Sequence, residues 1–392
     1  MDTTKVKCLA KQIRGVSYKP KDLHDSLDDN SVILLRANNI DDGKINFDDV
    51  VYVDKSKVSD EQYLKEGDVL ICTSSGSKKL VGKAASVNFD LQCTFGAFCK
   101  VIRPNAEVVD YLGIYFQSDI YRRKISEVAL GANINNIRNE HIDSLELPSY
   151  DSEQSQVIVR KISLLQTIMD NRKDELGKLD ELIKSRFVEM FGDNTYPKVK
   201  AAEICDFITK GTTPASKDIL PSEEEDTIPY LKVYNLSFTG DLLFRQESQY
   251  ISREIHEGKL ARSKVYPNDV LMNIVGPPLG KFALVTDEYS EWNINQAIAI
   301  FRAKERILPK FLLSALMQEK VIQPFIDQAV GVRQLNISLE QCRNLELILP
   351  PLEEQKKYVS FVEQVNKSKV AVQKALDETQ MLFDSLMQKY FG

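Results

Sequence analysis

The sequence predicts an α+β fold with an internal repeat, in which two similar globular domains are separated by two long helices. Three observations lead to this prediction. A long heptad pattern occurs twice, 200 residues apart. Each copy ends in Phe-Gly. The segments that precede the two copies share an order of short motifs. We therefore expect globular domains at 1–150 and 193–352, and helices at 151–192 and 353–392.

Both helices carry an apolar stripe with a strict 4-3 spacing, the 3.5-residue period of a coiled coil. An antiparallel pair with pseudo-two-fold symmetry is the natural arrangement because one chain supplies both helices. Pairing between two chains is the alternative. Charges at Arg172, Arg186 and Lys369 interrupt the stripe, where they either fix the register or reach its edge through their aliphatic stems. The predicted apolar seam comprises Ile158, Ile162, Leu165, Met169, Leu176, Leu179, Ile183, Met190, Tyr358, Val362, Val365, Val372, Leu376, Phe383, Leu386 and Tyr390.

The helix ends carry start and stop signals. Asp151 or Ser152 is suited to cap the first helix, and Pro350-Pro351 precede the second, where a missing N–H costs little. Gly192 is suited to a C-cap. Gly177 lies inside the first helix and should cost about 1 kcal/mol relative to Ala.

The two globular segments repeat four features in the same order. Each has a polar opening with Gly, a strand-like run, an Asp-Val-Leu strand and a Gly-Lys pair, and each then continues into a helix and an Asn-containing loop. The paired segments are 13–20 with 207–214, 32–38 with 230–235, 67–71 with 268–272, and 82–83 with 280–281. Short strands followed by helices are typical of an α+β domain.

Composition restricts the class of protein. The 392 residues carry a net charge of −6, whereas a DNA-binding domain usually has a basic excess, so any such binding must use local patches or a partner's surface. No apolar run is long enough for a membrane span, and the N-terminus has no signal-peptide core. The six cysteines form no C-x-x-C pair, which argues against zinc ribbons and fits a reducing cytoplasm.

No catalytic constellation stands out, and we predict no metal site, no cofactor and no enzyme activity. The stretch Gly276–Lys281 suggests a phosphate-binding P-loop, but only three residues separate its glycines. Phe282 also stands where Ser or Thr would meet the metal ion. Asp206 and His256 are expected to be structural or surface residues.

Arg, Gln and Asn side chains gather in the loops, and these residue types read base edges through paired hydrogen bonds. The alternative is that Asn-rich loops are simply turns. The basic run at 122–124 either faces solvent or contacts phosphates. The candidate DNA-contacting residues are Arg36, Asn38, Lys78, Lys79, Lys83, Arg122, Arg123, Asn133, Asn135, Lys210, Thr212, Thr213, Lys232, Asn235, Lys281, Arg333, Gln334 and Asn336.

The whole chain resembles the DNA-specificity subunit of type I restriction–modification systems. The resemblance rests on three stretches in the second half, at 204–214, 268–271 and 334–355. The last of these leads into the second long helix. The first half departs from the pattern in its opening, where Gly15-Val16-Ser17-Tyr18 replaces Gly-Thr-Thr-Pro.

The resemblance implies two target-recognition domains, each reading one half of a split site in double-stranded DNA, and helices that space the halves. It also implies two methyltransferase subunits as partners, a restriction subunit as an optional further partner, and no catalysis by the chain itself. The alternative hypothesis is a coiled-coil scaffold without DNA binding, which the acidic charge favours. A steep salt dependence of DNA binding would distinguish the two.

Overall fold

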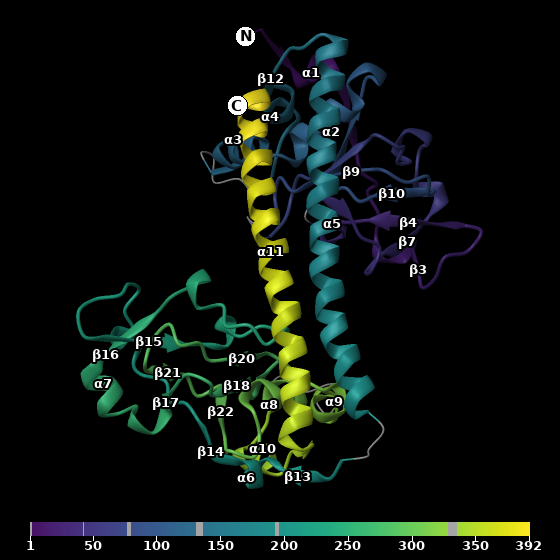
Figure 1. The fold of residues 1–392 in the computed structure, drawn as a ribbon. Coiled ribbons are helices and arrows are strands. Elements are labelled where there is room, and N and C mark those ends of the chain that lie inside the picture. The colour runs from purple at the N-terminus through teal and green to yellow at the C-terminus, as the bar shows by residue number, and fades with distance from the viewer. Residues whose placement is uncertain (1, 42, 77–79, 131–135, 193–195, 328–334) are drawn as a thin grey trace. The chain divides into compact units, whose positions relative to one another are not determined.

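The chain forms two units, each of which joins one globular domain to parts of both long helices (Figure 1). Unit 1 consists of Met1–Arg172 and Lys374–Gly392, and unit 2 consists of Lys173–Gln373. This computed structural model describes residues 2–41, 43–76, 80–130, 136–192, 196–327 and 335–392.

The globular domain of unit 1 is built on two four-stranded sheets. An antiparallel sheet has the order β2 (Ala10–Arg14), β11 (Cys99–Pro104), β8 (Val69–Cys72) and β9 (Ala84–Ser86). The second sheet has the order β10 (Cys93–Phe95), β4 (Ser31–Leu35), β7 (Val51–Asp54) and β3 (Leu23–His24), and its β10–β4 pair is parallel. Two smaller pairs are β1 (Thr3–Lys5) with β12 (Glu146–Pro148) and β5 (Ile40–Asp41) with β6 (Lys44–Ile45). Its helices are α1 (Val6–Leu9), α2 (Val109–Gln117), α3 (Asp119–Leu130) and α4 (Asn139–Asp143).

The globular domain of unit 2 repeats this plan. Its antiparallel sheet has the order β14 (Cys205–Lys210), β22 (Ile298–Ala303), β18 (Val270–Asn273) and β20 (Phe282–Leu284). Its second sheet has the order β16 (Tyr250–Ser252), β15 (Thr227–Leu231), β21 (Trp292–Ile294) and β17 (Lys264–Val265), with a parallel β15–β21 pair. The smaller pairs are β13 (Lys198–Lys200) with β24 (Glu346–Ile348) and β19 (Val275–Gly276) with β23 (Leu335–Asn336). Its helices are α6 (Ala201–Ile204), α7 (Arg253–Glu257), α8 (Pro309–Leu316), α9 (Glu319–Asp327) and α10 (Leu339–Arg343).

The predicted α+β repeat is confirmed, and it reaches further than the heptads. The helices α2, α3 and α4 begin 200 residues before α8, α9 and α10, and β12 begins 200 residues before β24. The strands that come earlier in each domain match at other offsets, because the loops between them differ in length. The second half of each domain, together with its long helix, is therefore the strictly repeated part of the chain.

The long helices are α5 (Ser152–Phe191) and α11 (Leu352–Phe391), drawn in teal and yellow in Figure 1. In unit 1 the buried Ile158 near the start of α5 shares a core with Phe391 at the end of α11. In unit 2 the end of α5 and the start of α11 share a core that contains Phe191 and Tyr358. The start of one helix meets the end of the other in each unit, so the pairing within each unit is antiparallel.

Every predicted seam residue is buried or half-buried. The seam leaves out Phe187, Phe191, Met387 and Phe391, which are also buried because they pack into the cores of the globular domains. Lys369 lies in the stripe at a position where α5 has Met169, and its ammonium is 2.6 Å from the Asp180 carboxylate.

One buried ion pair recurs in both domains and ties two central strands together. Asp68 and Asp269 are almost fully buried, and each accepts two hydrogen bonds from one guanidinium, that of Arg103 or Arg302, at 2.7 and 2.8 Å. Each carboxylate also accepts a backbone N–H three residues before it. The Asp-Val-Leu motifs therefore mark a structural ion pair.

Candidate nucleic-acid interface

A short backbone pairing joins two loops in each domain that are far apart in the sequence. In unit 2, β19 follows β18 and pairs with β23, which follows α9, so that Val275 lies opposite Asn336. In unit 1, Ser74 lies opposite Asn136. The next residue in each case, Ile337 or Ile137, donates its N–H to the carbonyl of Ile274 at 2.8 Å or of Thr73 at 2.7 Å. The structure therefore brings the Gly-Lys loop and the Asn loop together, which the sequence did not predict.

Asn136 and Asn336 are exposed and occupy equivalent positions in this pairing. Both lie in the Asn-containing loops that the sequence singles out for base contact, although only Asn336 is among the named candidates. The 200-residue offset that relates the heptads also relates these two asparagines, so this signal was available in the sequence. The candidates Lys78, Lys79, Asn133, Asn135, Arg333 and Gln334 fall outside the described residues.

The loop of unit 1 is held by basic side chains. The half-buried Arg122 of α3 donates a hydrogen bond from Nη1 to the Val81 carbonyl at 2.6 Å. Lys83 lies 3.4 Å from the Asp41 carboxylate, whereas Arg123 is exposed on α3. Arg122 thus supports the loop, and Arg123 faces solvent.

The equivalent loop of unit 2 is fixed by a buried asparagine. The Oδ1 atom of Asn273 accepts the Lys281 N–H at 2.7 Å, and its Nδ2 donates to the Pro278 carbonyl at 2.8 Å. Asn273 is fully buried, whereas Pro277 and Pro278 are exposed. The Lys281 ammonium lies 5.6 Å from the ring centroid of Phe238. The loop is therefore rigid at its base and presents its tip to solvent.

The prediction that Asn235 contacts DNA is wrong. Asn235 is fully buried, accepts the Lys232 N–H at 2.9 Å and donates to the Glu247 carbonyl at 3.1 Å. In unit 1 the same bonds are made by the buried Asn39, so the matching residue is Asn39 and not Asn38. Both asparagines hold a corner of the backbone, and neither faces solvent.

The neighbours of these buried asparagines are partly engaged. Arg36 and Asn38 both donate to the Asp49 carboxylate, at 3.0 and 2.8 Å. The Lys232 ammonium lies 6.0 Å from the ring centroid of Tyr234. Arg36 and Lys232 are half-buried, and Asn38 is exposed.

The opening of the second domain contains the candidates Lys210, Thr212 and Thr213. Thr212 accepts a hydrogen bond from Arg262 Nε at 3.1 Å, Lys210 is half-buried in β14, and Thr213 is exposed. The preceding Gly211 is required by space, because a Cβ there would lie 2.1 Å from the Asn295 carbonyl oxygen. Gly15 stands in the same relation to Gly96.

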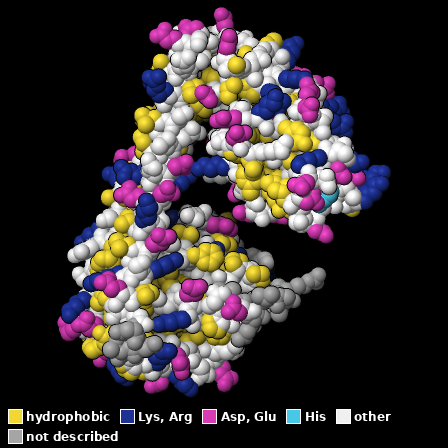
Figure 2. Space-filling model, turned by 90° about the vertical axis from the view of Figure 1, so that its right-hand side faces the viewer, with side chains coloured by type: hydrophobic (Ala, Val, Ile, Leu, Met, Phe, Trp, Pro, Cys, Tyr) yellow, Lys and Arg dark blue, Asp and Glu magenta, His cyan; other side chains and the backbone are white. Residues whose placement is uncertain are grey.

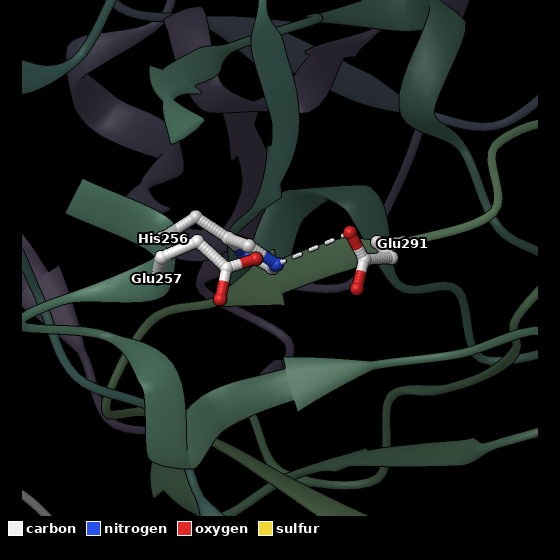
Figure 3. Close-up of side chains that lie close together, drawn as sticks. All are labelled: His256, Glu257 and Glu291. Carbon is white, nitrogen blue, oxygen red and sulfur yellow. Dashed lines mark ion pairs between the residues drawn. The ribbon is translucent and has the colours of Figure 1, made fainter. Parts of the chain in front are cut away.

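One cluster in unit 2 has the residue types of a metal site (Figure 3). Side-chain atoms of His256, Glu257 and Glu291 lie within 4.8 Å of one another, and His256 is fully buried. Asn293 Nδ2 faces His256 Nδ1 at 3.1 Å and also donates to the Leu260 carbonyl, which fixes the orientation of the amide. His256 Nδ1 is therefore the acceptor, and Nε2 carries the proton.

A protonated Nε2 has no lone pair for a metal ion. Both carboxylates are already paired with basic side chains: the Lys264 ammonium is 2.6 Å from Glu257, and the Arg253 guanidinium is 3.1 Å from Glu291. Burial lowers the pKa of His256, which favours the neutral ring. We interpret the cluster as a structural charge network.

The cysteines do not suggest nucleophilic chemistry. Burial raises the pKa of Cys93, Cys205 and Cys342 to about 12, so these thiols stay protonated near neutral pH.

On the face drawn in Figure 2, Lys and Arg side chains are interspersed with Asp and Glu over the surface. Among the helices that the structure describes, none is both long enough and apolar enough to cross a membrane.

Comparison with known proteins finds similarity to the specificity subunits of type I restriction enzymes. Residues 194–379 match the type I restriction modification DNA specificity domain. The EcoKI specificity subunit of Escherichia coli K12 is 26% identical over an alignment that covers 97% of this chain and 86% of that protein. Residues 194–379 therefore carry a type I restriction modification DNA specificity domain, and the chain as a whole is similar to a specificity subunit of a type I restriction enzyme. The StySPI specificity subunit of Salmonella potsdam is 36% identical over 183 residues, which cover 46% of this chain and 40% of the StySPI protein.

Solved structures share the fold of this chain. The S subunit of a type I system from M. genitalium superposes with a TM-score of 0.52 at 13% identity, covering 100% of this chain and 96% of that one. A chain from a study of complex assembly and conformational transition of the type I R-M system gives a TM-score of 0.55 at 18% identity, with 100% and 97% coverage. The likeness extends over both halves of the chain.

Proposed function

We propose that this chain is the DNA-recognition subunit of a type I restriction–modification complex and that it catalyses no reaction itself. The globular domains at 1–150 and 193–352 each read one half of a split site in double-stranded DNA. The single observation that supports this division is the loop pairing that recurs in both domains, Ser74 with Asn136 and Val275 with Asn336.

The paired loops suit base recognition for a physical reason. Asn136 and Asn336 are exposed amides that can donate and accept at a base edge, and each sits on backbone that is hydrogen-bonded to a second loop. A preformed loop loses little conformational entropy when it binds. Around these two equivalent positions the side chains differ between the domains, so we expect the two half-sites to differ.

The long helices supply the second part of the proposal. Each has 40 residues, which corresponds to about 60 Å at about 1.5 Å per residue. We propose that α5 and α11 set the length of unread DNA between the half-sites and dock two methyltransferase subunits, with a restriction subunit as a further partner. Positive surface from these partners would offset the net charge of −6.

A methylation map of the source genome by long-read sequencing tests the proposal. The map is compared between cells with the gene, cells with the gene deleted and deleted cells that carry a plasmid copy. We expect one split motif to lose methylation on deletion and to regain it with the plasmid. An unchanged map in cells whose methyltransferase subunit is expressed would contradict DNA targeting and would favour the scaffold alternative.

A further inference from the structure

The two domains carry equivalent hairpins beside their Gly-Lys loops. In unit 1 the hairpin is β5–β6, and in unit 2 it is the turn closed by the bridge between Leu236 and Leu242. Both turn through a glycine with positive φ, 73° at Gly43 and 88° at Gly240. The unit 2 hairpin is joined to the end of the loop by two hydrogen bonds between Ser237 and Phe282, at 2.8 and 3.1 Å.

The lysine of each Gly-Lys pair lies next to its hairpin, but it contacts a carboxylate in the first domain and an aromatic ring in the second. In unit 1, Lys83 pairs with the Asp41 carboxylate at 3.4 Å, so its charge is compensated. In unit 2, Lys281 lies over the ring of Phe238, and among the described residues no carboxylate lies within 4.0 Å of its ammonium to form an ion pair. Phe238 is 53% exposed, so its ring is accessible to a partner molecule.

We propose that Phe238 and Lys281 form an aromatic–basic contact with duplex DNA in the second domain, which the first domain replaces with the neutral Lys83–Asp41 pair. This inference rests on the proposed function and names residues that carry it. The uncompensated ammonium matches a backbone phosphate, and the exposed ring matches an apolar surface such as a sugar or a thymine methyl group.

The contact is held in place before DNA arrives. Ser237 Oγ accepts the backbone N–H of Thr239 at 3.2 Å and that of Asp241 at 2.7 Å, which fixes the hairpin turn. The buried Asn273 fixes the backbone of Lys281 from the other side. Because both residues stand on hydrogen-bonded backbone, binding orders only their side chains, and the entropic cost is small.

The test is the salt dependence of binding to a duplex that contains the methylated motif, measured with the chain in complex with its methyltransferase subunits. Binding weakens as salt rises, and each lysine–phosphate contact contributes about −0.9 to the slope of log K against log salt. Lys281→Ala should therefore make this slope less steep by about 0.9. Phe238→Ala should weaken binding about tenfold with an unchanged slope, because an apolar contact releases no counterions. The conservative Phe238→Tyr should retain most of the affinity.

The first domain provides the matched variant. Asp41→Ala removes the carboxylate that compensates Lys83, so the slope should become steeper by up to about 0.9. Wild-type affinity and slope in both Lys281→Ala and Phe238→Ala, with the wild-type complex binding its motif, would overturn this inference and leave the proposed function intact. Failure of the wild-type complex to prefer the motif over other duplexes would overturn both. Circular dichroism of each variant shows whether a lost affinity reflects lost folding.

Discussion

Replacing Asp269 with Ala should destabilise the second domain strongly and leave the first domain unaffected. The carboxylate is 2% exposed, holds Arg302 through two hydrogen bonds at 2.7 and 2.8 Å, and accepts the Tyr266 N–H at 2.8 Å. The variant would leave the guanidinium of Arg302, on β22, without its anion at the start of β18, which Asp269 directly precedes.

The expected loss of stability follows from the burial of Asp269 and the partial burial of Arg302. Breaking a buried ion pair by removing one partner costs about 3–5 kcal/mol. The Arg302 side chain is 32% exposed and regains some hydration, so we expect the lower end, about 3 kcal/mol. For a unit of this size, about 3 kcal/mol corresponds to a fall in Tm of about 6–12 °C.

Hydrogen exchange resolves the loss by domain. Amides of β18 and β22 should exchange faster in the Asp269→Ala protein, whereas those of β8 and β11 should keep their protection. Asp68→Ala should produce the mirror-image pattern, because Asp68 holds Arg103 in the same way. Asp287→Ala, at an exposed position, is the control and should stay within about 0.5 kcal/mol of the wild type. A loss below about 1 kcal/mol for Asp269→Ala would refute the structural role assigned to the pair.

Three further predictions concern the second unit. Gly211→Ala should lower the urea midpoint of unfolding by several tenths molar or more, because its Cβ would lie 2.1 Å from the Asn295 oxygen; an unchanged midpoint would contradict the packing. Gly177→Ala, which meets nothing within 4 Å on an exposed helix face, should raise stability by up to about 1 kcal/mol, and a loss of stability would contradict this. Burial lowers the pKa of His256 from 6.5, so the unfolded chain takes up this proton first as pH falls. The contribution of His256 to stability is therefore fully present above about pH 6.5 and is lost as pH falls towards the folded pKa. The urea midpoint of the His256→Gln protein should therefore depend less on pH than that of the wild type between about pH 7.5 and about pH 5.5. Identical pH profiles for the two proteins would oppose this assignment.

The repeat and the helix pair could be predicted from the sequence because their signals are local. A 3.5-residue period over a long segment reports a helix seam directly, and every predicted seam residue is buried or half-buried. The positions that the stripe missed, such as Phe187 and Met387, are buried by contacts with the globular domains. Those contacts depend on tertiary structure, to which helical periodicity is blind.

The candidate DNA surface was harder to predict because it depends on pairings between distant segments. Asn235 looked like a surface loop residue, yet its amide closes a buried corner, and its partner by structure is Asn39. The pairing of β19 with β23 involves two residues on each side, which is too short to leave a strand pattern. Phe238 carried no motif, and its exposure became visible only in the folded chain.

The central claim is that two separate domains read two half-sites and that the helices set the gap between them. It is tested most directly by inserting one heptad after Arg172 in α5 and one after Gln373 in α11. Methylation is then mapped in cells that express the methyltransferase subunits and in which this variant is the sole specificity gene. Seven residues add about 10.5 Å of helix, or at most about three base pairs at about 3.4 Å each. The account predicts that both half-sites stay the same while the unread gap becomes longer. Methylation with an unchanged gap, or with altered half-sites, would contradict it.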